Sequence, residues 1–323
     1  MLPEQTPTAE DIRAARERIV PYAHSTPLLT SRTLDKRTGR HILLKCENLQ
    51  RVGAFKFRGA CNAVFSLSEE EARKGVVTHS SGNHAQALAL AARIRGIPAR
   101  IVMPRTAPAV KVAAVKGYGA EITFCEPTLA ARTAAADAIM ASTGATLIHP
   151  YDDPRVIAGQ ATCALEILES GENPDMLMCP VGGGGLTSGT ALSARYFGGG
   201  KVRVIAAEPA GADDAFRSFT TKTFVPQTSP KTIADGLLTS LGKLTFPIIL
   251  ETVSDIVTVS ERSIVEAMRL LWERCKLVVE PSGAVPLAAL LEGKGAPEGS
   301  TVALILSGGN VDLDRLPWIS AGT

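Results

Sequence analysis

Short apolar segments alternate with helical segments along most of the chain, and this alternation constrains the possible fold more than any other feature. Strands are predicted at residues 76–78, 99–103, 121–124 and 146–148. Helices are predicted between them at residues 85–94, 108–116 and 130–142. Such alternation is typical of βαβ units, which form a parallel sheet covered by helices.

Later apolar runs predict a second sheet, with strands at residues 176–179, 202–206, 255–259 and 301–306. Continuous apolar runs of this kind suit strands that helices cover on both faces. A further strand at 42–45 leads towards Lys56, and a helix is expected from there to about Gly75.

Two sheets in one chain of 323 residues predict a two-domain α/β protein with its ligand between the domains. Residues 1–70 and 150–323 are expected to form a large domain, and residues 71–149 a small one.

Composition excludes several classes of function. The net charge of +2 gives no electrostatic reason to expect nucleic acid or a membrane as a partner. No apolar run reaches the ~18 residues of a membrane span, and no basic and apolar leader opens the chain. The six cysteines form no C-x-x-C pair, which favours a reducing cytoplasm over disulfides or a zinc site. They are Cys46, Cys61, Cys125, Cys163, Cys179 and Cys275.

The segment Phe55-Lys56-Phe57-Arg58-Gly59-Ala60 places a lysine between two phenylalanines. Apolar neighbours lower the pKa of an amine by desolvation, and only a deprotonated amine attacks a carbonyl. Small flanking residues let a flat ligand approach the backbone. The alternative is a solvated lysine between two core rings.

A glycine run, Gly182, Gly183, Gly184 and Gly185, joins a predicted strand to a predicted helix. Such a run can turn backbone N–H groups inwards, and the helix N-terminus adds a positive dipole. A flexible linker is the alternative, but polar residues would then be expected on both sides. The run therefore predicts a phosphate site.

Two other turns follow predicted strands, where α/β sheets present ligand-binding loops. One is Ser307-Gly308-Gly309-Asn310, and the other is Ser80-Ser81-Gly82-Asn83-His84. Taken alone, the first could be a plain turn and the second a helix cap without a ligand.

Together these segments call for a ligand with a phosphate, an aromatic ring and an aldehyde, and pyridoxal phosphate has all three. From residue 26 to 313 the chain resembles the fold type II pyridoxal-phosphate enzymes, in the serine/threonine dehydratase and serine racemase branch. The resemblance implies a two-domain fold like that of the tryptophan synthase β chain. Each domain would be a mainly parallel twisted sheet flanked by helices.

The resemblance also implies roles for individual residues. Lys56 would hold the cofactor as a Schiff base and move the Cα proton, with Ser81 as a second acid/base opposite it. The other cofactor contacts would be Phe55 on the ring, Asn83 at the phenolic oxygen, Gly182 to Gly185 at the phosphate and Ser307 at the pyridine nitrogen. The substrate α-carboxylate would be enclosed by Ser80, Ser81, Gly82, Asn83 and His84.

The segment from Glu208 to Asp214 resembles the divalent-cation motif of the same branch. Glu208, the Ala212 carbonyl and Asp214 would be ligands of Mg²⁺, or of Ca²⁺ or Mn²⁺, with waters completing the shell. An acidic surface loop is the alternative. The resemblance further implies a homodimer.

Arg132 matches an arginine of the serine racemase relatives that faces the substrate side chain. A guanidinium there pairs far better with a second carboxylate than with the methyl group of threonine, although a surface arginine is the alternative. Tyr151 departs from the asparagine of the mammalian racemases, which weakens the case for serine racemisation.

The resulting hypothesis is a pyridoxal-phosphate dehydratase (ammonia-lyase) that acts on a β-hydroxy-α-amino acid. The favoured substrate is 3-hydroxyaspartate, which would give oxaloacetate and ammonia. A serine racemase or a serine/threonine dehydratase is the alternative within the enzymes. A β-replacement synthase fits less well, because the metal motif belongs to the other branch. Outside the enzymes, the alternative is a non-catalytic protein that binds pyridoxal phosphate or an amino acid.

Overall fold

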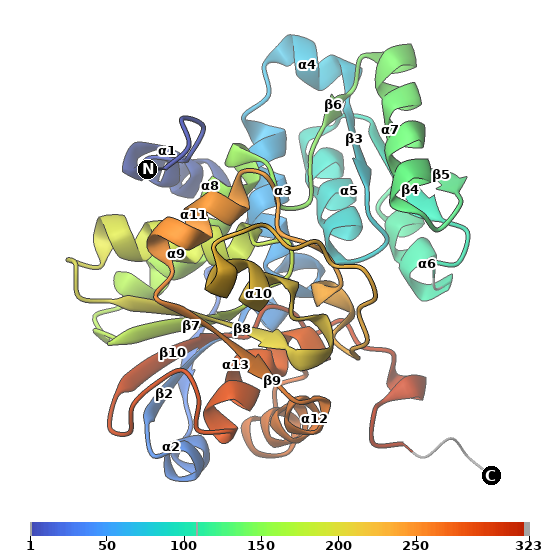
Figure 1. Cartoon of the computed structure of the whole chain (residues 1–323). Helices are drawn as coiled ribbons and strands as arrows, with labels where there is room; N and C mark the ends of the chain where they lie inside the picture. Colours follow the sequence, from blue (N-terminus) through green and yellow to red (C-terminus); the bar gives the residue numbers. More distant parts are fainter. Residues whose placement is uncertain (1, 108, 320–323) are drawn as a thin grey trace.

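The computed structural model describes residues 2–107 and 109–319, and its ribbon is built around two sheets (Figure 1). The larger sheet has six strands in the order β1-β2-β10-β7-β8-β9. All neighbouring pairs are parallel except β1 with β2. The strands are β1 (Leu28–Thr30), β2 (His41–Lys45), β7 (Met176–Pro180), β8 (Arg203–Pro209), β9 (Asp255–Val259) and β10 (Thr301–Ile305).

The smaller sheet has four parallel strands in the order β5-β4-β3-β6. They are β3 (Val76–His79), β4 (Ala99–Pro104), β5 (Glu121–Cys125) and β6 (Thr146–Leu147). Every predicted strand is present, with ends shifted by at most three residues. The prediction of an α/β fold with two mainly parallel sheets is therefore confirmed.

Helices cover both sheets, and their order along the chain completes the alternation. They are α1 (Ala9–Ile19), α2 (Arg32–Thr38), α3 (Lys56–Phe65), α4 (Glu69–Lys74), α5 (Asn83–Arg95), α6 (Ala109–Gly117), α7 (Leu129–Thr143), α8 (Pro154–Leu168), α9 (Gly185–Phe197), α10 (Asp214–Thr221), α11 (Thr245–Thr252), α12 (Glu261–Leu270) and α13 (Pro281–Leu291). The helix predicted at 108–116 begins at Pro108, which lies outside the described residues. No helix within the described ranges combines the length and the apolar character that crossing a membrane requires.

The single helix predicted from Lys56 to Gly75 is wrong, because two helices occupy this stretch. Helix α3 ends at Phe65, and Ser68 starts α4 with a reciprocal capping box to Glu71. A serine cap satisfies N–H groups that a continuous helix would have bonded internally, so the chain turns here.

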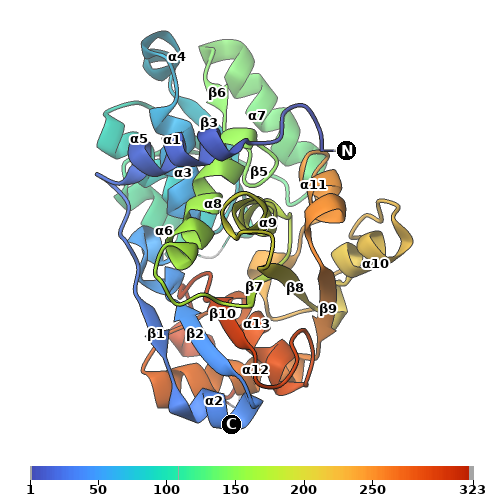
Figure 2. The same ribbon diagram turned by 90° about the vertical axis from the view of Figure 1, so that its left-hand side faces the viewer.

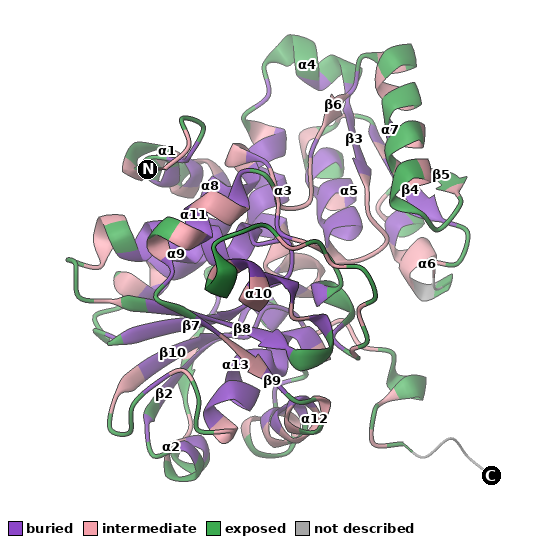
Figure 3. Ribbon diagram, viewed as in Figure 1, coloured by how far each residue is buried: buried purple, intermediate pink, exposed green. Residues whose placement is uncertain are grey.

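The helices divide the core into layers (Figures 2 and 3). Helices α12 and α13 pack with one face of the large sheet, and α8 and α9 pack with the other. Helix α3 lies between α8 and α5, and so connects the two sheets through buried side chains. Helix α7 has only one buried residue, Ala136, and forms the outer layer of the small sheet.

The sheets draw their strands from separate parts of the chain. Strands β3 to β6 come from residues 76–147, and the other six strands come from the segments before and after. This separation supports the domain division that we propose, with residues 71–149 as the small domain and residues 1–70 and 150–323 as the large one.

Candidate active site

The lysine segment lies against the loop that follows β10. Ala54 forms an antiparallel bridge with Gly308, and the Phe55 N–H donates to the Ser307 carbonyl at 3.0 Å. Lys56 is then the first residue of α3. Two segments about 250 residues apart in the chain are thus joined through their backbones, directly before the lysine.

The Lys56 amine is held in a half-buried position. Its Nζ donates to the Pro150 carbonyl at 2.7 Å and lies 5.2 Å from the centre of the Phe55 ring. Burial lowers the pKa of Lys56 to about 8. A useful fraction of the amine is therefore unprotonated near neutral pH, as a nucleophile or a proton acceptor requires.

A buried ion network lies behind Lys56 and includes Arg58 on the same helix. Its guanidinium donates to both oxygens of Glu47 at 2.8 Å, and to the two oxygens of Glu166 at 2.7 and 2.8 Å. Lys45 completes the network with a 2.6 Å bond to Glu166. Two cations face two carboxylates, so the charges balance in a region that water barely reaches.

Asn83, at the first turn of α5, belongs to a hydrogen-bonded network that also holds the loop after β10. Its Nδ2 donates to Glu280 at 2.9 Å, and its Oδ1 accepts from Asn310 Nδ2 at 2.9 Å. The Asn310 N–H donates to Glu280 at 3.1 Å. Burial, and next the charge of Asp235, raise the pKa of Glu280 to about 7.

Glu280 is a residue that the sequence did not predict. It stands just before Pro281, which opens α13, and this position matches no motif. The only signal in the sequence is that a carboxylate lies between an apolar, strand-like run and a helix that is rich in small residues. Gly308 is needed beside it, because a Cβ there would lie 2.5 Å from a Glu280 oxygen.

The glycine run fills a tightly enclosed loop between β7 and α9. All four glycines, Gly182 to Gly185, are buried. A Cβ on Gly183 would lie 2.3 Å from the Tyr151 ring, and Gly184 has a φ of 89° and would meet Thr245 at 2.9 Å. Since α9 begins at Gly185, its first N–H groups have no acceptor inside the helix. This cradle fits a bound phosphate and would not tolerate larger residues.

The turn from Ser80 to His84 follows β3 and leads into α5. Ser80, Ser81 and Gly82 are half-buried, and a Cβ on Gly82 would meet no atom within 4 Å. This open space lies where a substrate carboxylate was predicted. His84 differs from the rest of the turn, because its ring is buried and its Nε2 bonds the Ile148 carbonyl at 3.1 Å.

Two rings that follow β6, His149 and Tyr151, form a cluster with His79 at the end of β3. His149 packs edge-to-face with His79 at 5.6 Å and with Tyr151 at 4.6 Å between ring centres. Burial lowers the pKa of His149 to about 4, and that of His79 falls through burial and the charge of Arg132. Burial raises the pKa of Tyr151. All three rings are therefore uncharged at neutral pH.

Arg132, at the start of α7, lies close enough to His79 and Tyr151 for its charge to act on both. Its side chain is half-buried, and its Nε makes only a long 3.4 Å bond to the Thr128 carbonyl. No carboxylate of the described residues pairs with it. The guanidinium thus has unused capacity to bind an anion.

Two buried carboxylates lie at the end of β8. Glu208 accepts from the Ala215 and Phe216 N–H groups, and Asp214 accepts from Gln227 at 3.0 Å. Burial raises the pKa of Glu208 to about 9 and that of Asp214 to about 6. Asp214 Oδ2 is buried and has no described partner. Within the described ranges no group of three or more His, Cys, Asp or Glu could hold a metal, so Ala212 would have to contribute its carbonyl.

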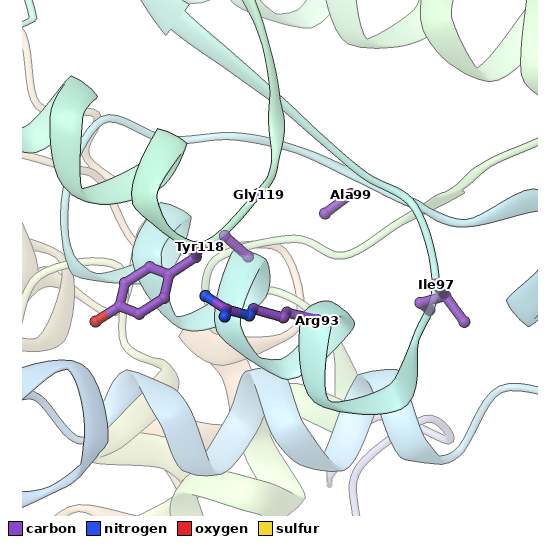
Figure 4. Close-up of a pocket in the computed structure, with 6 residues that line it drawn as sticks. Arg93, Ile97, Ala99, Tyr118 and Gly119 are labelled. Carbon is purple, nitrogen blue, oxygen red and sulfur yellow. The ribbon is translucent and has the colours of Figure 1, made fainter.

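A separate hollow of about 180 Å³ lies at the other end of α5 (Figure 4). Arg93 and Tyr118 are among its lining residues, and Arg93 donates to the Gly117 carbonyl at 3.1 Å. Asn83 and Arg93 are ten residues apart on α5, so about 15 Å of helix separates this hollow from the site.

Comparison with known proteins places this geometry in context. The family described as "Pyridoxal-phosphate dependent enzyme" matches residues 19–308. A β-hydroxyaspartate dehydratase of Paracoccus denitrificans is 51% identical, with 97% of this chain and 99% of the relative covered. An L-threo-3-hydroxyaspartate ammonia-lyase of Saccharomyces cerevisiae is 49% identical, with 98% and 97% covered. The crystal structure of serine racemase from Dictyostelium discoideum superposes with a TM-score of 0.91 at 49% identity, with 96% and 100% covered.

Proposed function

This chain belongs to the family of pyridoxal-phosphate dependent enzymes, and from that membership and its site we propose that it is a 3-hydroxyaspartate ammonia-lyase. The reaction eliminates the β-hydroxyl as water, and hydrolysis of the dehydrated product then consumes one water and yields oxaloacetate and ammonia. The observation that carries the substrate choice is Arg132. Its half-buried guanidinium has no carboxylate partner among the described residues, and its charge acts on the His79 and Tyr151 rings.

The residues of the site fit pyridoxal phosphate. Lys56 offers an amine of lowered pKa, and the Gly182–Gly185 cradle offers backbone donors with no room for a side chain. Asn83 lies within reach of the same region and is fixed by Glu280 and Asn310. Ser307 is buried beside the lysine segment, where its hydroxyl would meet the pyridine nitrogen. When bound, the cofactor supplies an electron sink that lowers the barrier to removing the Cα proton.

Lys56 takes the Cα proton in this proposal. The Pro150 carbonyl orients Nζ, and burial keeps the pKa of the amine near the working pH, where proton transfer is most efficient. Ser81 serves as the second acid/base on the other face. We place the α-carboxylate in the open space beside Gly82, with Ser80, Ser81 and Asn83 as its other contacts. The β-hydroxyl then leaves as water, and the product hydrolyses to the 2-oxo acid and ammonia.

The position of the His84 ring limits which part of this residue can contact the substrate. The resemblance implies a contact with the α-carboxylate, but the ring faces the protein interior and bonds Ile148. Burial, and next the charge of Lys56, lower the pKa of His84 well below its ordinary value. We propose that only the backbone of His84, in the first turn of α5, contributes to the carboxylate site.

The charge balance favours a dicarboxylate. Lys56 and Arg132 are the cations of the site, whereas two nearby acids, Asp152 and Asp153, are engaged elsewhere. Asp152 accepts from the N–H groups of residues 243 to 245, and Asp153 pairs with Arg155 at 2.6 Å. A second substrate carboxylate would therefore meet a guanidinium that has no carboxylate partner among the described residues, although the charges of Asp137 and Asp152 also act on the neighbouring rings.

We also propose a divalent cation at Glu208, the Ala212 carbonyl and Asp214, with Mg²⁺ the first choice and Ca²⁺ or Mn²⁺ as alternatives. Burial raises the pKa of both carboxyls and so disfavours their charged forms, which a cation bound between them would stabilise. The unpartnered Asp214 Oδ2 is an available ligand.

Two further parts of the proposal concern assembly and compartment. We propose a homodimer, by analogy with this branch of the family. The six cysteines are all unpaired, which supports a reducing cytoplasm.

A rate comparison tests the proposed activity. Ammonia release from L-serine, L-threonine and each stereoisomer of 3-hydroxyaspartate is measured with the purified holoenzyme. We expect the highest kcat/KM with a 3-hydroxyaspartate isomer. A wild-type enzyme that prefers serine or threonine, or that racemises serine faster than it eliminates, would replace this proposal with the serine racemase/dehydratase alternative.

A further inference from the structure

Arg132 is not the only donor close to the His79 and Tyr151 rings, because His149 packs against both of them. We propose that His149 is a second specificity-determining residue, whose Nε2–H donates a hydrogen bond to the side-chain carboxylate of the substrate. This inference rests on the proposed function, since only a dicarboxylate brings such an oxygen. It assigns a role to a residue that neither the sequence motifs nor the relatives' names indicate.

Backbone hydrogen bonds fix which nitrogen of His149 carries the proton. Its Nδ1 lies 2.9 Å from the Asp152 N–H and 3.4 Å from the Tyr151 N–H, and both groups can only donate. Nδ1 must therefore accept, and in the neutral ring the proton resides on Nε2. His149 is neutral because burial, and next the nearby His79, lower its pKa to about 4.

The Nε2–H donor is left free. No described residue accepts a hydrogen bond from it, and it is not among the buried polar atoms that lack a partner. The atom is therefore open to solvent. The His79 and Tyr151 rings hold the imidazole edge-to-face on two sides, which restricts its rotation. A donor that is fixed in direction and open is preorganised for an acceptor on a ligand.

The groups around His149 favour an anionic acceptor. Lys56 on α3, His79 on β3 and His84 on α5 lie near His149. In the free protein each of them makes protonation of the His149 ring less favourable. Asp152 and Asp153 follow it in the chain and are already bonded to other groups. A carboxylate that binds here gains from the cations and from the neutral donor without displacing an acid.

Arg132 and His149 belong to one constellation. The Arg132 charge acts on His79 and on Tyr151, which are the two rings that enclose His149. Arg132 can supply a paired, charged contact, whereas His149 supplies a single neutral donor from the loop after β6. Two donors from separate elements, α7 and the loop after β6, define the direction of a carboxylate better than one.

Two substitutions separate the donor role from a purely structural role of His149. His149→Asn retains a polar atom near the position of Nδ1, which can accept from Asp152, but it removes the Nε2–H. His149→Gln retains an amide donor near the position of Nε2 instead. The exposed His41→Asn, on β2, is the matched control for the chemical change away from the site.

The primary measurement is the ratio of kcat/KM for 3-hydroxyaspartate to kcat/KM for serine, which cancels losses of folded enzyme. We expect the ratio to fall roughly ten- to a hundredfold in His149→Asn, as for a lost hydrogen bond to a charged group, mainly through KM. It should stay within about threefold of wild type in His149→Gln and in His41→Asn. The calorimetric Kd for succinate, an unreactive dicarboxylate, should rise by a similar factor in His149→Asn and stay near the wild-type value in the other two variants.

The outcomes are distinct. A ratio that falls and a succinate Kd that rises in His149→Gln but not in His149→Asn would show that Nδ1 and the loop matter, and would overturn the inference. Unchanged values in both variants would overturn it as well. If the wild-type ratio favours serine, the proposed function fails, whatever the variants do. If the wild type favours 3-hydroxyaspartate and the variants do not differ, only the role of His149 is wrong.

Discussion

Replacing Arg132 with alanine is the perturbation that most directly separates a dicarboxylate substrate from serine. The guanidinium is half-buried and lacks a carboxylate partner among the described residues. Two unit charges 4 Å apart interact by about 4 kcal/mol at an effective dielectric constant of about 20. Because water reaches a half-buried group, about 2–3 kcal/mol is the reasonable loss. At about 1.4 kcal/mol per tenfold, kcat/KM for 3-hydroxyaspartate should fall about 30- to 160-fold.

The assay is the initial rate of ammonia release at several concentrations of each substrate, with serine measured beside 3-hydroxyaspartate. Serine has no second carboxylate, so its kcat/KM should change by less than about threefold. Arg132→Lys keeps the charge but loses the paired donors, and we expect an intermediate loss of about tenfold. Equal losses on serine and 3-hydroxyaspartate would refute the reasoning, because they would indicate damage to the fold or to the common chemistry.

The other predictions concern the lysine, the cation and the buried networks. Lys56→Ala should retain its circular dichroism spectrum while ammonia release falls by at least ~10²-fold, since the group that transfers the proton is gone. The rate at which cofactor-free enzyme takes up pyridoxal phosphate should rise about tenfold per pH unit and level off near pH 8. This is expected because burial lowers the pKa of Lys56 to about 8 and only the neutral amine reacts. A rise that continues beyond pH 9.5 would contradict this. A chelator should lower the melting temperature or the rate, and Mg²⁺ or Ca²⁺ should restore it; no effect on either would remove the cation proposal. Arg58→Met should lower the free energy of unfolding in urea by about 3–5 kcal/mol, since Glu47 and Glu166 lose their common partner. A loss below about 1 kcal/mol would show that the ion network does not stabilise the fold in this way.

Much of the fold could be predicted because its strands are short apolar runs at regular spacing. Strand β1 was missed, since three residues, Leu28 to Thr30, that are half-buried or exposed carry no periodicity. The split of the predicted 56–75 helix was also missed, although Ser68 and Glu71 form the capping-box pattern that marks the start of a new helix. Both errors occur where a local signal is two or three residues long and tertiary contacts decide the outcome.

The sequence proposes site residues only where several of them form one local pattern. Lys56, the glycine run and the turns at Ser80 and Ser307 each carry chemistry in consecutive residues, and the structure places Ser307 beside the lysine segment. Glu280 could not be found in this way, because its partners Asn83 and Asn310 come from different strand-to-helix turns.

His149 shows a second reason why sequence patterns fall short. A histidine between an apolar strand and a proline has no chemical signature, since either nitrogen can carry the proton. Its donor capacity arises only when the Asp152 N–H bonds Nδ1 and leaves Nε2 open. Residue type sets which reactions are available to a side chain, whereas the backbone around it decides which of its atoms can take part. Specificity residues of this kind are therefore found from hydrogen-bond directions and not from motifs.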